Sequence, residues 1–289
     1  MKGLSNQVIP HNSWRNRLAV ITGASSGIGA ATARQLARKG LRVALIARRR
    51  ERLAALADEI EQAGGEALIL PADLTQEAAR QQVFEQITTE NGAVDVLVNN
   101  AGLGWYGYGA EMPWNTALEI LQVNVAAAVH FTLLFLKKMK EHGRGHIINI
   151  GSIAGSLPSQ GVAIYGASKA FMDNFTTALY RELTGTPIHI SVLRAGPVRT
   201  EFCETAAGRQ NGRHLPTEHT GVSAEKVAGS VWGLLRRPRR VLYVPAWLGV
   251  TPLVETCFGW LIDCLGPLLL RRQVSDNSSI IRHRLETDP

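Results

Sequence analysis

Residues 17–29, RLAVITGASSGIG, join an apolar run directly to a glycine-rich turn. The run Arg17–Thr22 predicts a buried strand, and a helical pattern over Ile28–Lys39 follows at once. A phosphate can approach the backbone at such a helix start only where side chains are absent, and the free N–H groups there favour an anion. An ordinary glycine-rich turn is the alternative, but the strand–turn–helix context favours a dinucleotide phosphate site. The residues of this site are Gly23, Ser25, Ser26, Gly27, Ile28 and Gly29.

Outward from this turn, apolar strand-like runs alternate with longer helical patterns. The runs are mostly continuous in Val, Ile and Leu, which is typical of strands covered on both faces of a parallel sheet. This alternation predicts an α/β fold with a single doubly wound parallel sheet. The expected strands are Arg17–Thr22, Leu41–Ala47, Ala67–Pro71, Val94–Asn99, His146–Gly151, His189–Leu193 and Val241–Val244. The expected helices are Ile28–Lys39, Arg50–Ala63, Gln76–Asn91, Trp114–His142, Ala163–Leu183 and Ala224–Arg236.

The composition excludes several classes of protein. With 289 residues, 45% of them hydrophobic, the chain can build a sizeable core and needs no disulfide or metal staple. The three cysteines and the histidines lack metal-ligand spacing, so we expect no metal site and a reducing, cytoplasmic compartment. The net charge of 31 − 24 = +7 suits an anionic ligand or a membrane surface. Nucleic acid binding is not expected, because no recognition motif accompanies the charge.

Three segments follow from these patterns: a polar N-terminal tail at 1–16, a nucleotide-binding and catalytic domain at 17–245, and a C-terminal extension at 246–289. Within the domain, the stretch Thr200–Gly221 is polar and shows no clear periodicity. A long loop in a compact domain is usually functional or mobile.

The residues after the second expected strand indicate the choice of cofactor. An acidic residue ~20 positions beyond the glycines binds the ribose 2′-hydroxyl of NAD, whereas an arginine there accommodates the 2′-phosphate of NADP. Nineteen positions after Gly29 comes Arg48, and no carboxylate appears before Glu51. The sequence therefore predicts NADP(H), with Arg48 as the contact. Asp73 follows the third strand and either bonds the adenine amino group or caps the next helix.

A tyrosine, a lysine and a serine form the candidate catalytic group. Tyr165 and Lys169 are four residues apart on an expected helix and so share one face. A nearby ammonium stabilises a phenolate, which makes the phenol a usable general acid for a carbonyl oxygen. Such a pair is also common on protein surfaces. Ser152 favours the catalytic interpretation, because it ends the fifth strand, at the edge where open α/β sheets bind ligands.

These motifs together resemble the classical short-chain dehydrogenase/reductase family over roughly residues 17–245. The motifs are Thr22–Gly29, Asn99–Gly102, Asn124, Ser152, Tyr165 and Lys169. The resemblance implies a Rossmann-type sheet of order 3-2-1-4-5-6-7 and hydride transfer with NADP(H). It implies that Tyr165 is the acid/base, that Ser152 orients the carbonyl, and that Lys169 binds the nicotinamide ribose and tunes Tyr165. Asn124 would hold a relay water behind Lys169.

The resemblance also implies further contacts with the cofactor. They come from Asp73, Leu74, Asn100, Ala101, Gly102, Tyr165, Lys169, Gly196, Val198 and Thr200. The segment Arg194–Thr200 is similar to the family's P-G-x-x-x-T motif, which closes over the nicotinamide. It departs from the motif at Ala195, where the family usually has proline.

The C-terminal extension predicts an apolar helix that begins at Thr251 and Pro252, a hydroxyl cap followed by a first-turn proline. Its small and polar residues share one narrow stripe, and Pro267 should kink or end it. The wide apolar face has three alternatives: packing on its own domain or a partner subunit, a membrane interface reached through residues 246–272, or a membrane span. The resemblance implies a homodimer or homotetramer.

The sequence thus predicts an NADP(H)-dependent oxidoreductase that interconverts a ketone or aldehyde and an alcohol. Aromatic residues after the fourth strand, the Thr200–Gly221 loop and the apolar extension favour an apolar substrate of lipid, steroid or acyl type. The alternative is a non-catalytic NADP-binding or scaffold protein on the same fold. Association with a membrane surface is compatible with both.

Overall fold

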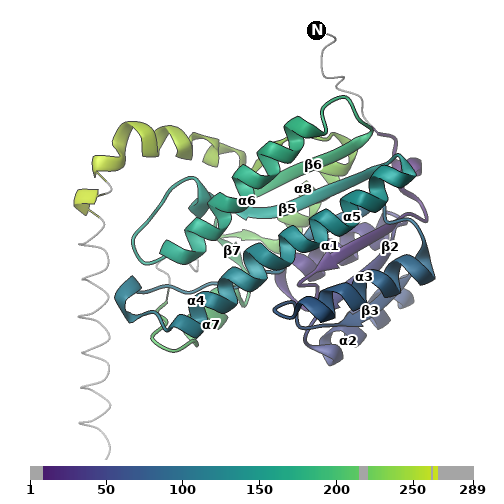
Figure 1. Cartoon of the computed structure of the whole chain (residues 1–289), viewed down its shortest axis with the longest axis horizontal. Helices are drawn as coiled ribbons and strands as arrows, with labels where there is room; N and C mark the ends of the chain where they lie inside the picture. Colours follow the sequence, from purple (N-terminus) through teal and green to yellow (C-terminus); the bar gives the residue numbers. More distant parts are fainter. Residues whose placement is uncertain (1–8, 215–220, 262, 266–289) are drawn as a thin grey trace, which may run out of the picture.

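One parallel sheet organises the chain, for which the computed structural model describes residues 9–214, 221–261 and 263–265. Its strands follow the order β3-β2-β1-β4-β5-β6-β9, which confirms the predicted order, with β9 as the seventh strand (Figure 1). They are β1 (Leu18–Thr22), β2 (Arg42–Ala47), β3 (Ala67–Pro71), β4 (Val96–Asn99), β5 (Gly145–Ser152), β6 (Ile188–Ala195) and β9 (Val241–Val244). Because every pairing is parallel, the carboxyl ends of all seven strands meet at one edge.

Helices cover both faces of the sheet, so the strands are buried on both sides. Along β1, Ala19 and Ile21 pack into the core beneath α1, α2 and α8, and Leu18 and Val20 pack into the core beneath α3, α5 and α6. This alternation explains why the strands are apolar at every position. The helices are α1 (Gly27–Arg38), α2 (Arg50–Gln62), α3 (Glu77–Asn91), α5 (Ala128–His142), α6 (Ala163–Glu182) and α8 (Ala224–Arg236).

The expected helix Trp114–His142 forms, but in three parts. An α-helix, α4 (Trp114–Leu121), passes through a π-helical segment, η3 (Gln122–Ala127), into α5 (Ala128–His142). Among the described residues, this is the one helix long and apolar enough to cross a membrane by length and composition. Its side chains Phe131 and Phe135 are fully buried against the sheet, however, as in the core helix of a globular domain.

Part of the predicted N-terminal tail packs on the domain. Residues 1–8 lie outside the described residues, but Trp14, at the end of η1 (His11–Trp14), is buried in the core. The backbone N–H of Ile9 donates to the carbonyl of Arg236 at 2.8 Å. This segment therefore packs against the end of α8.

The stretch Thr200–Gly221 contains regular structure that its composition does not indicate. A short helix, α7 (Phe202–Ala207), follows directly on β7 (Val198–Arg199), which pairs in parallel with β8 (Val222–Ser223). Residues 215–220 of this stretch lie outside the described residues.

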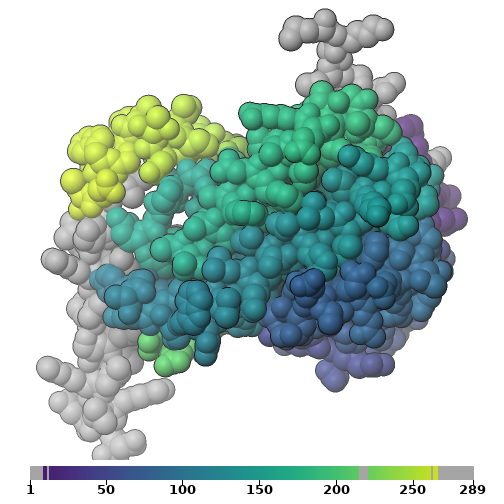
Figure 2. Space-filling model, viewed as in Figure 1, coloured from purple at the N-terminus to yellow at the C-terminus, as the bar shows by residue number. Residues whose placement is uncertain are grey.

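The C-terminal extension begins with η6 (Ala246–Val250) and continues as helix over residues 251–261 and 263–265, as its cap predicts. Much of its apolar surface is exposed and does not pack on the domain. Thr251 is buried and its Oγ1 donates to the carbonyl of Leu248 at 2.8 Å, whereas Leu253 and Trp260 are 66% and 64% exposed. Figure 2 shows the segment standing out from the body of the molecule. Pro267 lies outside the described residues.

The buried face of α5 should dominate stability. Replacing Phe131 by Ala removes a fully buried ring between α5 and the sheet, so we expect the free energy of unfolding to fall by about 3–5 kcal/mol. The matched control Lys140→Ala, on the exposed face of the same helix, should change it by less than about 0.5 kcal/mol. Denaturant unfolding of both variants measures the difference. Equal losses in the two variants would contradict the assigned core.

Candidate active site

The glycine-rich turn between β1 and α1 is shaped by contacts that leave no room for side chains. Gly23 and Gly27 have φ angles of +66° and +53°, a region that favours glycine. A Cβ atom on Gly29 would lie 2.2 Å from the carbonyl oxygen of Gly23, and one on Gly27 would lie 3.0 Å from Thr200 Cγ2. The turn is therefore an open backbone cradle at the N-terminus of α1, which suits a dinucleotide phosphate.

The end of β4 is joined to this turn by hydrogen bonds. Thr22 Oγ1 accepts from the backbone N–H groups of Asn100 and Ala101 at 3.0 and 2.9 Å. In return, Asn100 Nδ2 donates to the carbonyls of Thr22 and Gly23. The predicted residues Asn100 and Ala101 thus lie beside the cradle.

Arg49, which the sequence analysis did not select, provides the cation at the cradle. Its guanidinium donates to the hydroxyls of Ser25 and Ser26 at 2.8–3.1 Å. Arg48, the predicted contact, instead turns toward Glu119, with Nη1 3.2 Å from Oε1. The sequence places both arginines at the end of β2 and so indicates a cation there. Which of the two reaches the glycine turn depends on the direction of each side chain.

Glu201 balances the charge of this region. Its carboxylate lies 2.6 Å from both Arg49 and Arg52. Burial raises the pKa of the Glu201 carboxyl. Hydrogen bonds from Arg52, Ser26 and Arg49 outweigh that effect and lower the pKa to about 2. The carboxylate is therefore ionised at neutral pH and holds Arg49 against the glycine turn.

Asp73 makes a local turn at the end of β3. Its Oδ1 accepts the backbone N–H of Thr75 at 3.0 Å, which stabilises the turn but does not cap α3, because that helix begins at Glu77 after Gln76. A cofactor contact of Asp73 and Leu74 remains a prediction.

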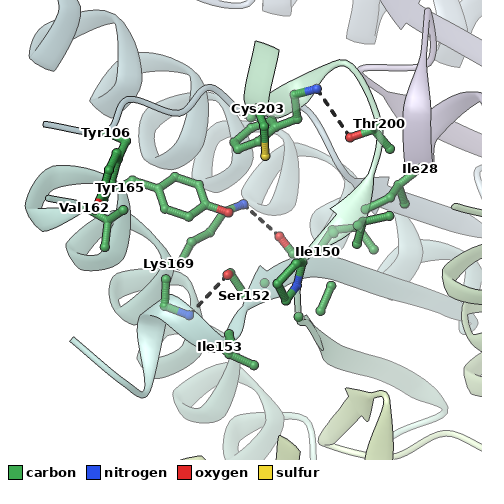
Figure 3. A pocket seen from close by; sticks show the side chains of 18 of the residues that line it. Ile28, Tyr106, Ile150, Ser152, Ile153, Val162, Tyr165, Lys169, Thr200 and Cys203 are labelled. Atoms are coloured by element: carbon green, nitrogen blue, oxygen red, sulfur yellow. Dashed lines mark hydrogen bonds between the residues drawn. The ribbon is translucent and has the colours of Figure 1, made fainter. Parts of the chain in front are cut away.

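The three predicted catalytic side chains converge on one cavity. Tyr165, from the first turn of α6, lies beside Ser152 at the end of β5, and Lys169 approaches from one helical turn further along (Figure 3). Burial raises the pKa of the Tyr165 hydroxyl, a hydrogen bond with Ser152 lowers it, and the neighbouring Cys203 raises it. In the protein alone, Tyr165 is thus a protonated phenol, ready to act as an acid.

Lys169 is buried and fixed in place. Its Nζ donates to the backbone carbonyl of Ile150 at 2.9 Å. Burial lowers the pKa of Lys169 to about 8, against the opposing effect of the Asp173 carboxylate. The amine therefore lies close to a change of charge at physiological pH.

Asn124 lies in the π-helical segment, a device that often occurs at functional sites. Its Oδ1 accepts the backbone N–H of Leu103 at 2.7 Å, and its Nδ2 donates to the carbonyl of Leu103 and the hydroxyl of Ser168. A Cβ on Gly102 would lie 3.5 Å from both Asn124 Oδ1 and Lys169 Nζ. The side chain thus joins the β4 end to α6, directly behind Lys169.

The segment after β6 borders the cavity. Ala195 continues β6 and pairs with Ser152 and Val244, so the missing proline leaves a regular strand. Beyond it, Gly196 packs so closely on Leu248 that a Cβ would lie 2.6 Å from Leu248 Cδ1. Gly196, Val198 and Thr200 all line the cavity.

The cavity has a volume of about 640 Å³. Two segments that the sequence indicated for the substrate side contribute to its lining, Tyr106 after the fourth strand and Phe202 and Cys203 from the Thr200–Gly221 stretch. The ring of Phe202 lies 5.6 Å from that of Tyr165. Among the described residues, no group of three His, Cys, Asp or Glu side chains is arranged to hold a metal ion.

Comparison with known proteins identifies the family. The sequence model described as short chain dehydrogenase matches residues 17–211. The chain belongs to the short-chain dehydrogenase family. It is 33% identical over 231 residues to the NADP-dependent 3-hydroxy acid dehydrogenase YdfG of Salmonella typhi, covering 78% of this chain and 91% of that one.

Solved structures of the family agree with this assignment. The closed form of serine dehydrogenase complexed with NADP+ has a TM-score of 0.72 at 31% identity, covering 78% of this chain and 93% of that one. The bulky-bulky ketone specific alcohol dehydrogenase from Comamonas testosteroni has a TM-score of 0.69 at 28% identity, covering 79% and 86%. The protein is thus an NADP-dependent oxidoreductase of the short-chain dehydrogenase family.

Arg49 should determine the affinity for the 2′-phosphate. We expect Arg49→Gln to raise the Kd for NADPH about tenfold or more, because a charge-assisted hydrogen bond contributes about 1.5–3 kcal/mol. The Kd for NADH should barely change. Fluorescence titration with both cofactors measures this, with Arg48→Gln as the matched variant. If Arg48→Gln raised the Kd for NADPH strongly and Arg49→Gln did not, Arg48 would be the residue that binds the 2′-phosphate.

Proposed function

We propose that the protein interconverts a bulky, apolar ketone and the corresponding secondary alcohol. The observation that carries this proposal is the apolar lining of the cavity that also holds Tyr165. The large apolar side chains of that lining include Leu157, Val162, Phe202, Leu261 and Leu265. An apolar wall with a few polar groups at one end is typical of a site that binds an apolar ligand and orients its reacting group. The bulky-ketone specificity of the Comamonas testosteroni relative supports the same class.

The residues of the cavity fit NADP(H). The glycine turn offers a backbone cradle free of side chains, Arg49 offers a cation beside it, and Lys169 and Thr200 border the space between cradle and catalytic group. When bound, the nicotinamide supplies the hydride for reduction or accepts it in oxidation.

The chain's own residues move the proton. In reduction, the Tyr165 hydroxyl donates its proton to the carbonyl oxygen while Ser152 donates a hydrogen bond to the same oxygen. The Lys169 ammonium stabilises the phenolate that remains. In oxidation the same phenolate removes the alcohol proton.

The side chain of Asn124 is held by hydrogen bonds on the Lys169 side of the cavity. Both N–H groups of its amide and one lone pair of Oδ1 are engaged by Leu103 and Ser168. A relay water behind Lys169 would therefore use the remaining lone pair or the backbone carbonyl of Asn124.

Tyr165→Phe tests the catalytic role against the non-catalytic alternative. The substitution keeps the ring and removes the acidic hydroxyl, so we expect turnover of a bulky ketone to fall by about 10²–10⁴-fold with little change in the Kd for NADPH. NADPH oxidation is measured with ketones graded in apolar size, alongside cofactor titration. A variant that retains full turnover would refute the proposed role of Tyr165. Turnover of small polar ketones in preference to bulky ones would refute the substrate class.

The family resemblance predicts a homodimer or homotetramer. We propose that it forms through the face made by α4, α5 and α6. Apolar side chains on these helices are exposed: Leu118, Leu133 and Phe171. All three helices belong to the same side of the sheet (Figure 1). Burial of this face against a second copy would remove the exposed apolar area from water.

We also propose that the C-terminal helix contacts a lipid surface. Leu253 and Trp260, seven residues apart, share one side of this helix, and both are more than half exposed, as are Phe258 and, in the preceding η6, Trp247. Tryptophan and aliphatic side chains on one side of a helix are typical of an interfacial segment. Leu261 is partly exposed and also lines the cavity, so the helix borders the proposed substrate site.

Vesicle flotation tests the lipid contact. We expect the full chain to float with phosphatidylcholine–phosphatidylglycerol vesicles and Trp260→Glu to lose most of this binding, because a charge replaces a ring at the apolar interface. The matched control Trp114→Glu alters another exposed tryptophan, on α4, and should float like the wild type. Absence of flotation, or equal loss in both variants, would refute the contact.

A further inference from the structure

A buried carboxylate lies on the same helix as Tyr165 and Lys169 and takes no part in the reaction described above. Asp173 is 5% exposed and lies on α6, four residues beyond Lys169, which itself lies four residues beyond Tyr165. Residues at this spacing share one face of a helix. The helix therefore presents a phenol, an ammonium and a carboxylate in a row.

The strand end that carries Ser152 is built around this carboxylate. A Cβ on Gly155 would lie 2.8 Å from Asp173 Oδ2, and a Cβ on Gly151 would lie 3.3 Å from Oδ1. The two glycines on either side of Ser152 thus leave the space that the carboxylate fills. A charged group in so enclosed a place requires a partner of opposite charge.

Arg194 on β6 is that partner. Its Nε lies 3.1 Å from Asp173 Oδ2, and both side chains are largely buried. The guanidinium also lies 5.2 Å from the ring centroid of Tyr243 on β9 and donates to the hydroxyl of Tyr243. Asp173 therefore has two cations near it: Arg194, with which it forms an ion pair, and Lys169, one turn away on the same helix.

We infer that Asp173 is a positioning residue, which holds Lys169 as an ammonium behind Tyr165, and that Arg194 sets how strongly Lys169 feels the carboxylate. This inference rests on the roles proposed above for Tyr165 and Lys169. The titratable or charged groups near Lys169 and Asp173 come from several elements. They are Tyr165, Cys203, Arg194 and Tyr243.

The electrostatics of the three groups agree with this arrangement. Burial lowers the pKa of Lys169 to about 8, and Asp173 raises it. Burial raises the pKa of Asp173, whereas Arg194 and Lys169 lower it. Without the charge of Asp173, Lys169 and Tyr165 would therefore lose a proton at lower pH. Without the charge of Arg194, they would keep that proton to higher pH.

The pH dependence of kcat/KM for ketone reduction, at saturating NADPH and with a ketone that does not ionise, measures this effect. Activity needs the proton of Tyr165 and the charge of Lys169, so it falls as pH rises through the basic limb. We expect Asp173→Asn to move that limb to lower pH by roughly one unit, and Arg194→Gln to move it to higher pH. The double variant should return it close to the wild-type position.

The controls separate this inference from a purely structural role. Tyr243→Phe keeps the ring beside Arg194 and removes only the hydroxyl, so the limb should stay in place. If Asp173→Asn does not fold, Arg194→Gln and the double variant still carry the test. An unmoved limb in Arg194→Gln, or a shift to lower pH, overturns the inference.

Tyr165→Phe, assayed in parallel, distinguishes the two levels of the proposal. If that variant retains full turnover, the proposed reaction roles fail. If it loses turnover while the limb does not move in the charge variants, only the role of Asp173 and Arg194 fails.

Discussion

The hydrogen bonds that join the ends of β1 and β4 hold the rest of the site in register. Thr22 and Asn100 bond each other's backbone, so the glycine turn and the β4 end behave as one rigid edge. From this edge, Leu103 reaches Asn124, and Asn124 reaches Ser168 on α6. Binding and proton transfer thus depend on one continuous hydrogen-bonded frame across four elements.

Much of the fold was predictable because its signals are local. Continuous apolar runs identify strands buried on both faces, and glycine spacing identifies a turn that no side chain could enter. The positions of Ser152, Tyr165 and Lys169 follow from the same local logic: a strand end and a helical repeat place them together. The cavity they share confirms this convergence.

Features that depend on distant contacts could not be predicted in this way. Arg48 and Arg49 are neighbours in sequence, and only Glu119 and Glu201, far along the chain, decide where each guanidinium points. The side chain of Asn124, in the π-helical segment, likewise bonds the backbone of Leu103, which lies far away in the sequence. The exposure of Leu253, Phe258 and Trp260 could not be inferred from the sequence, because a wide apolar face does not state whether the domain, a partner subunit or a membrane covers it.

The row of functional groups on α6 has a consequence for how this enzyme can diverge. Each added or lost residue rotates the rest of an α-helix by about 100°. One insertion between Tyr165 and Asp173 would therefore turn the carboxylate away from its glycine-lined space and point another side chain into it. Length variation among descendants of this protein should accordingly gather in the loops that border the cavity, and the eight-residue interval of α6 should be inherited unchanged.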